Sequence, residues 1–257
     1  MSRRLKFALI LFLAISLGSL VLSEVELPKA EPGLPPSLTY PMGTSLDGEN
    51  MVTLNAEAVW DTVLFGLLSG AITTVITSLS SLAVYGRFRV RGVLVRLADA
   101  VNSLPRLPFL LVLALILGTP TGSGIAMNFF LTALVVSLTG VGQFMRQGIE
   151  FFEADQTFRS LREVGIVLRR RARFVVTRMG ITFYLPAFVD GITAFTGIGV
   201  VGGVGDPLYP TLTTLLNVAA SFLYLWWIFL VPALFRALLL VSVLILADEV
   251  RKNVKVN

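Results

Sequence analysis

The chain contains no cysteine and no histidine, and only 14% of its 257 residues are charged. The absence of cysteine excludes disulfide bonds, thiol catalysis and cysteine-ligated zinc, and the absence of histidine excludes any triad or general base built on an imidazole. A soluble domain has about one quarter charged residues, so the low charge argues against an ordinary cytosolic enzyme. The excess is apolar instead, with 55% hydrophobic residues and a mean hydropathy of +0.81.

Long apolar stretches dominate the sequence. A membrane-spanning helix requires about 20 mostly apolar residues, and six stretches meet this requirement: residues 7–22, 59–85, 97–118, 125–144, 181–204 and 220–246. The sequence therefore predicts an all-α integral membrane protein with six transmembrane helices. The first stretch follows basic residues, as a signal peptide does, but no clean small-residue cleavage site follows it, so we expect a retained helix.

The segments between these stretches differ in length and composition. We expect four regions: an N-terminal transmembrane helix at 1–23, an extracytoplasmic loop at 24–58, a core of five transmembrane helices at 59–247 and a cytoplasmic tail at 248–257. The loop is rich in proline and glycine, which excludes one continuous helix there.

Three connections within the core are also predicted. Residues 86–96 are expected to form a short basic inner turn and residues 205–219 a short outer loop. Residues 145–180 are too polar for the bilayer and carry apolar residues at helical spacing, which predicts a helix–turn–helix on the cytoplasmic surface.

Charge asymmetry sets the orientation. With the N-terminus in the cytoplasm, 18 of the 21 basic residues lie on the inner side, whereas acidic residues prevail outside. The net charge of +5 fits arginines that face anionic lipid headgroups better than it fits nucleic-acid binding. The positive-inside rule therefore predicts a multi-pass protein of the plasma membrane with both termini in the cytoplasm.

One motif lies in the large inner segment. Arg146 begins this segment, and Gly165 follows nineteen residues later, at the end of the stretch FRSLREVG. This arrangement resembles the cytoplasmic loop of ABC importer permeases, in which E-A-A-x-x-x-G follows an R-G pair at the same distance. The resemblance aligns Arg159, Ser160 and Leu161 with the E-A-A triplet, whose own residues are lost.

Further stretches resemble one branch of these permeases in the same order. YPMGTSLDG at residues 40–48 is similar to H-P-L-G-T-D-x-x-G, VRLAD at 95–99 with a later proline to M-R-x-x-D…P, and LADEVR at 246–251 to L-G-D-x-L-R. Two more features match the same branch of permeases. One is an acidic residue seven positions before GIG at 197–199, and the other is WW at 226–227 followed by a proline. The matching positions are Pro41, Gly43, Thr44, Gly48, Arg96, Asp99, Pro105, Arg146, Gly197, Gly199, Pro232, Asp248 and Arg251.

The chain thus resembles the C-type permease subunit of peptide/nickel/oligosaccharide ABC importers, over roughly residues 38–252. The resemblance implies a type I importer fold, with a cytoplasmic coupling segment at 147–178 between spans four and five. It also implies a second homologous permease, which would complete a heterodimer, two cytoplasmic ATPase subunits and an extracytoplasmic solute-binding protein. The coupling contacts it implies are Arg159, Ser160, Leu161, Arg162, Glu163, Gly165 and Leu168.

Several features have simpler interpretations. GIGVVG at residues 197–202 matches the dinucleotide pattern G-x-G-x-x-G, but it ends an apolar span, so close helix packing or a loop that lines the outer gate is favoured. Gly66 and Gly70 form a G-x-x-x-G packing face. The arginines at 169–173 are assigned to lipid headgroups. The tryptophans at 226–227 are expected in an interfacial aromatic belt rather than stacked on a substrate.

Asp190, Arg236 and Arg106 are charged residues in the interior of the predicted spans. An ionisable group near the centre of a bilayer costs about 3 kcal/mol and faces a bundle interior, a partner or a wet cavity. Asp190 and Arg236 lie near mid-depth in spans five and six, so we expect them to form a mutual ion pair, with lining of the translocation path as the alternative role. Arg106 follows Pro105, which is expected to break the span and expose Arg106 to the cytoplasm.

The sequence thus predicts a subunit that imports peptides or oligosaccharides, with no catalytic residue, metal site or cofactor of its own; ATP and Mg²⁺ would bind the partner ATPases. Two alternatives stay open. One is a permease-like scaffold that no longer couples to ATP, which the lost triplet favours. The other is a secondary carrier, which would normally contain paired repeats that this sequence does not show.

Overall fold

The computed structural model describes residues 2–25, 27–86, 88–117, 125–154, 169–202 and 210–256. These residues form eight α-helices and no strand, apart from an isolated bridge between Thr44 and Asn50. The helices are α1 (Arg3–Ser23), α2 (Met51–Gly86), α3 (Phe88–Ser103), α4 (Arg106–Leu117), α5 (Ile125–Ala154), α7 (Arg169–Gly202), α8 (Leu212–Ala220) and α9 (Trp226–Val256). The predicted all-α class is confirmed for the described part of the chain.

Five of these helices are long and apolar enough to cross a membrane. The qualifying segments are Arg3–Ser23, Met51–Val84, Phe129–Ala154, Ala172–Gly199 and Trp226–Lys252. They match five of the six predicted spans, and the fold is that of a multi-pass membrane protein.

The expected span at 97–118 is divided into two helices. α3 ends at Ser103 and α4 begins at Arg106, with Pro105 between them. Proline disfavours helical geometry in the residue before it, which explains the break. The 12 residues of α4 extend about 18 Å at the usual helical rise, less than a bilayer core of about 30 Å. A sixth span therefore stays a prediction.

The helices begin and end at places that hydropathy did not predict. α2 starts at Met51, inside the expected loop, because the Asn50 side chain accepts a hydrogen bond from the Val52 amide (2.9 Å) and caps the helix. Residues 88–96, expected to form a turn, belong to α3.

The expected outer loop at 205–219 contains α8, which starts in a capping box between Thr211 and Thr214. Proline and threonine immediately before an apolar run were the sequence signal for this start, and hydropathy alone did not register it.

The large inner segment is also different from the prediction. Its described parts, 145–154 and 169–180, continue α5 and α7 as uninterrupted helix. They therefore do not form a separate pair of surface helices. The stretch at 155–168 lies outside the described residues.

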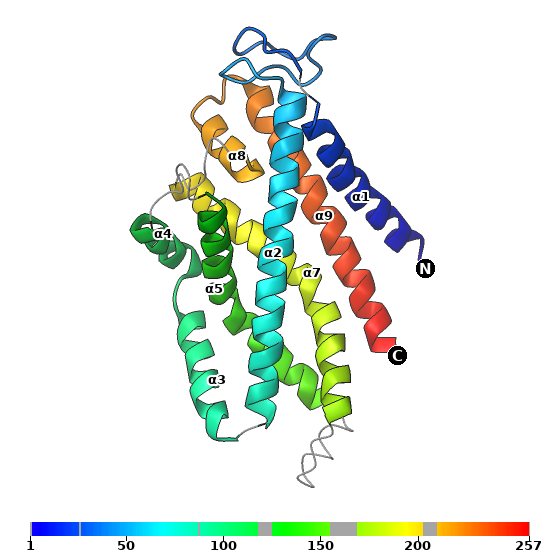
Figure 1. Cartoon of the computed structure of the whole chain (residues 1–257), viewed down its shortest axis with the longest axis vertical. Coiled ribbons are helices and arrows are strands. Elements are labelled where there is room, and N and C mark those ends of the chain that lie inside the picture. Colours follow the sequence, from blue (N-terminus) through cyan, green and yellow to red (C-terminus); the bar gives the residue numbers. More distant parts are fainter. Residues whose placement is uncertain are drawn as a thin grey trace.

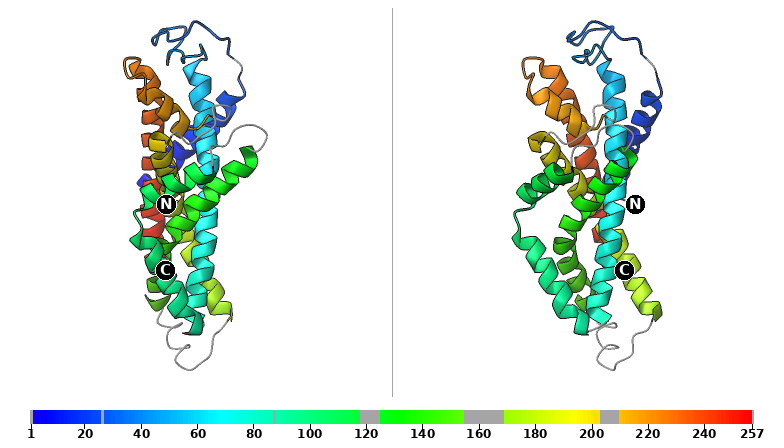
Figure 2. Two further views of the ribbon diagram at one scale, coloured as in Figure 1. Left: turned by 90° about the vertical axis from the view of Figure 1, so that its left-hand side faces the viewer. Right: turned by 60° about the vertical axis from the view of Figure 1, so that its left-hand side comes forward.

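α2 is the central helix of the bundle. It contacts α1, α3, α5, α7, α8 and α9, and it runs almost the full length of the molecule (Figure 1). The loop between α1 and α2 covers one end of the bundle, whereas the C-terminal end of α2 and the start of α3 lie at the opposite end (Figure 2). With 36 residues, α2 is about 54 Å long and exceeds the thickness of a bilayer core.

Small residues bring α2 and α7 close together. A Cβ atom added at Gly66 would lie 2.6 Å from Cε2 of Phe188, and one at Gly70 would lie 3.1 Å from the Phe188 backbone nitrogen. The predicted packing role of this glycine pair is confirmed. Nearby, the rings of Phe65 and Phe195 stack with centroids 4.2 Å apart.

Candidate functional site

A cavity of about 490 Å³ lies among α4, α7 and α9. It is lined by Arg106, Leu107, Asp190, Thr193, Ala194, Thr196, Gly197 and Arg236. Asp190, Arg236 and Arg106, which the sequence places in the interior of spans, therefore border one space. An apolar bundle that keeps three ionisable groups around a cavity is typical of a functional site within a membrane protein. We call it the Arg236 cavity.

Arg106 and Asp190 form a two-pronged ion pair. Nη1 of Arg106 lies 2.6 Å from Oδ1 of Asp190, and Nη2 lies 2.8 Å from Oδ2. Nε of Arg106 also donates to Thr139 Oγ1 at 3.2 Å, and Nη2 donates to the Val136 carbonyl at 3.1 Å. Gly140 makes room for the pair, because a Cβ atom there would lie 2.8 Å from Oδ2 of Asp190. Arg106 is therefore held inside the bundle and is not exposed as predicted.

The expected pair between Asp190 and Arg236 is wrong. Both carboxylate oxygens of Asp190 are taken by Arg106. Within the described part of the chain, Arg236 makes no hydrogen bond or ion pair, and its Nε atom is buried without a partner. The two residues border the same cavity, so the prediction placed them correctly near each other but chose the wrong arginine.

A second arginine–aspartate pair joins α3 to α5. Nε of Arg146 lies 3.0 Å from Oδ1 of Asp99, and the Arg146 Nη2 group contacts the same oxygen. The two side chains are 61% and 44% exposed. Both residues are positions of the permease resemblance, identified in two separate motifs. The fold brings them into contact although they are 47 residues apart.

The motif at residues 40–48 folds into a compact outer loop. Gly43 and Gly48 adopt φ of +76°, a left-handed conformation that favours glycine. Thr44 is completely buried and donates to the Glu31 carbonyl (2.8 Å), while its own carbonyl accepts from Nε1 of Trp227 (3.2 Å). Trp227 is therefore a buried anchor beneath the loop, which neither interpretation of the tryptophan pair had anticipated. Its neighbour Trp226 is 54% exposed.

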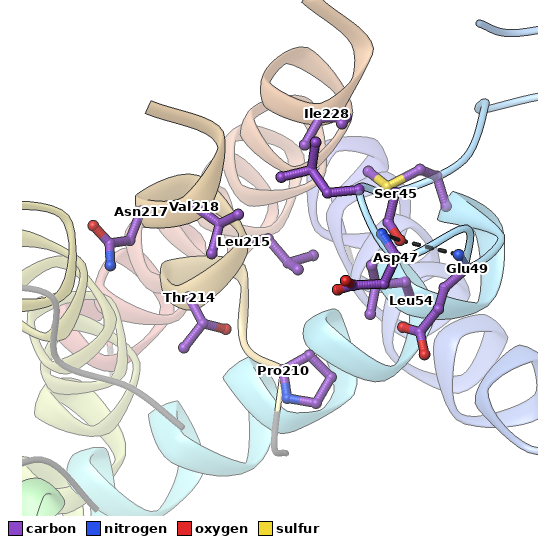
Figure 3. A pocket seen from close by; sticks show the side chains of 12 residues that line it. Ser45, Asp47, Glu49, Leu54, Pro210, Thr214, Leu215, Asn217, Val218 and Ile228 are labelled. Atoms are coloured by element: carbon purple, nitrogen blue, oxygen red, sulfur yellow. Dashed lines mark hydrogen bonds between the residues drawn. The ribbon is translucent and has the colours of Figure 1, made fainter. Parts of the chain in front are cut away.

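A smaller pocket of about 270 Å³ lies beside this loop. Figure 3 shows Asp47 and Glu49 on one side of it and Thr214, Leu215 and Val218 of α8 on the other. Leu46, Met51, Leu54 and Ile228 add apolar side chains to its lining, and Glu49 is paired with Lys29 (3.0 Å). The pocket joins two elements that sequence reasoning treated as separate loops.

The other motif positions lie apart from these contacts. Gly197 packs on Leu107, since an added Cβ would lie 2.7 Å from Cδ2 of that leucine, which supports a packing role. Gly199 and Pro232 are buried, and Arg96 and Pro105 are exposed. Asp248 pairs with Lys252 one turn further along α9, and Arg251 is exposed.

The predicted coupling residues at 159–168 lie outside the described residues. Among the residues that are described, no group of three or more acidic side chains gathers closely enough to hold a metal ion. No family model matches the sequence, and a search of curated proteins finds no similar protein.

Proposed function

We propose that the chain is the transmembrane permease subunit of an ATP-driven ABC importer for peptides or oligosaccharides. In this proposal it forms half of a translocation path and has no catalytic residue of its own. A second permease completes the path, two cytoplasmic ATPases drive it, and an extracytoplasmic solute-binding protein delivers cargo. The membrane is the plasma membrane, with both termini in the cytoplasm.

The observation that supports this proposal is that motif positions from distant segments contact one another. Asp99 pairs with Arg146, and the Gly43–Thr44 turn rests on Trp227. Chance matches scattered along an apolar chain have no reason to meet in space. A set of positions that form contacts is instead typical of motifs that stabilise one fold.

The mechanism follows from the expected position of the coupling segment. Closure of the ATPases on ATP would push on residues 147–178, of which the described parts are the C-terminal end of α5 and the N-terminal end of α7. Both helices contribute residues at or next to the cavity. Asp190 lies on α7, and Thr139 and Val136, which bind Arg106, lie on α5. Movement of these helices would alternate access to the cavity, driven by the differential binding of the two states.

Co-purification tests the partners. The full chain, isolated from its native membranes in a mild detergent, should retain an ATPase subunit and a second permease. Gly165→Trp should lower ATPase retention and ATP-dependent uptake because it adds bulk where the resemblance places a close contact. Gly92→Trp is the matched control, since nothing lies within 4 Å of a Cβ atom at Gly92. A scaffold or a secondary carrier would retain no ATPase in either case.

Cysteine labelling tests the orientation on a background that contains no native cysteine. Leu38→Cys is the better outer probe, because Leu38 is fully exposed whereas Ser45 is buried and accepts two backbone hydrogen bonds. Leu38→Cys should react with an impermeant thiol reagent from outside, and Ser160→Cys only after permeabilisation. Labelling of Ser160→Cys from outside would contradict the proposed topology and the permease function together.

A further inference from the structure

The charges around the Arg236 cavity do not balance. Asp190 is neutralised by Arg106, which also donates hydrogen bonds to Thr139 and to the Val136 carbonyl. Among the described residues that line the cavity, Arg236 is then the cation without a partner, and its Nε atom is buried. The cavity therefore carries one uncompensated positive charge.

A charge in this position is costly to keep unpaired. An ionisable group inside an apolar bundle normally pairs with another group or borders a wet path. The neighbouring threonines do not compensate for the charge, because the hydroxyls of Thr193 and Thr196 are neutral; both donate to carbonyls of their own helix. An anion that enters the cavity would supply the partner that the described chain lacks.

The chemistry of the guanidinium selects the kind of anion. Its planar fork matches the two oxygens of a carboxylate, and such charge-assisted bonds are about twice as strong as neutral ones. The volume of about 490 Å³ is that of a small-molecule site. A neutral sugar would leave the charge of Arg236 unpaired on binding, and a carboxylate would not.

We propose that the Arg236 cavity binds the carboxylate of an anionic solute, with Arg236 as the binding residue and the Arg106–Asp190 pair as a fixed wall. This inference rests on the proposed function and deepens it. It favours carboxylate-bearing cargo over uncharged oligosaccharides, a choice that the resemblance leaves open.

The test uses the purified full chain in an uncharged detergent and two probes that differ in one group. N-acetyl-alanyl-alanine carries a free carboxylate, and its C-terminal amide does not. The free acid should raise the thermal unfolding midpoint with increasing concentration, and the amide should not. Equal shifts of the unfolding midpoint with the two probes would overturn the proposal. This test uses the parent protein alone, so it does not depend on the folding of a variant.

Three variants locate the effect. Arg236→Gln should weaken binding of the free acid at least about tenfold, since a hydrogen bond to a charged group is lost. Arg236→Lys should retain part of the binding. Arg251→Gln is the matched control, because Arg251 is an exposed arginine on the same helix. An Arg236→Gln protein that responds like the parent would overturn the assignment of this residue.

The companion subunit is the other conceivable source of a carboxylate. If Arg236→Gln abolished co-purification of a second permease and the free acid had no effect on the parent, Arg236 would be a subunit contact and the proposal would be wrong. Failure of the proposed function has a different signature: the chain would bind the free acid through Arg236 but retain no ATPase.

Discussion

The two arginine–aspartate pairs join helices in contrasting surroundings. The Arg106–Asp190 pair lies between α4 and α7, with side chains 26% and 24% exposed, and it uses both carboxylate oxygens. The Arg146–Asp99 pair lies between α3 and α5, is more than 40% exposed on each side and uses one oxygen. The same two residue types therefore serve a central, enclosed contact and a peripheral one.

The packing of the helix backbones also differs between the centre and the periphery of the bundle. In the centre, added Cβ atoms at Gly66 and Gly70 of α2 would press on Phe188 of α7. On α3, nothing lies within 4 Å of such an atom at Gly92, and Val93 and Leu97 are exposed. The α2–α7 centre is therefore a tightly packed core, whereas α3 contacts the bundle along only part of its surface. Stability should therefore depend strongly on the centre and weakly on α3.

The largest expected effect comes from breaking the central pair. Asp190→Asn leaves the Arg106 charge enclosed without its counter-ion and should destabilise the protein by about 3 kcal/mol. The double variant Asp190→Asn/Arg106→Met should recover much of this loss, because neither charge remains. A thermal-unfolding cycle measures both. Asp190→Asn/Arg236→Met should show no such recovery, and additive losses for Arg106 and Asp190 would contradict their pairing.

The next effect concerns the central glycines. Gly66→Val should destabilise by about 1–3 kcal/mol, because the new side chain must displace Phe188 or Ile192 from a packed contact. Gly92→Val on α3 should be close to neutral. Thermal unfolding of the two variants in the same detergent gives the comparison, and equal losses would show that α3 is packed as tightly as the centre.

Hydropathy predicted the existence of the five long helices but did not predict the residues at which they begin and end. An apolar run shows which residues avoid water, but a helix begins where backbone amides find a cap, as α2 does at Asn50. The same limitation hid α8, which starts at a local threonine capping box. Pro105 did signal the break in the third stretch, because proline acts on its neighbours through local sterics.

The sequence predicted which charged residues line the candidate site, but not which of them form an ion pair. Rare charges in apolar stretches pointed to Asp190, Arg236 and Arg106 because each is costly in lipid. Which arginine meets Asp190 depends on how α4 packs against α7, and the partners are 84 residues apart in the chain. The sequence indicates how deep each residue lies in the membrane, but it does not indicate which helices are neighbours. The buried role of Trp227 likewise depends on the fold of a loop that lies 183 residues away.

A smaller effect tests how α3 is attached. Gly142 of α5 approaches α3 closely, since an added Cβ would lie 2.9 Å from the Ala98 carbonyl oxygen and 2.7 Å from Asn102 Oδ1. Gly142→Ala should shift α3 outward and cost about 1 kcal/mol. Hydrogen exchange should rise along α3 and stay unchanged in α2 and α7. Faster exchange throughout the bundle would mean that α3 belongs to the central core.

The smallest expected effect on stability is that of the peripheral pair. Asp99→Asn or Arg146→Gln should cost less than about 1 kcal/mol, because an exposed ion pair gains little over its interactions with water. The loss should vanish at about 1 M salt, where charges are screened beyond about 3 Å, whereas the loss from Asp190→Asn should persist. Thermal unfolding at two salt concentrations measures this contrast.

If the two residues are permease motif positions, uptake and ATPase retention should fall further than stability does, because the pair links α3 to the helix that leads into the coupling segment. A stability loss as large as that of Asp190→Asn would instead show that exposure does not separate the two pairs, and the division between centre and periphery would be wrong.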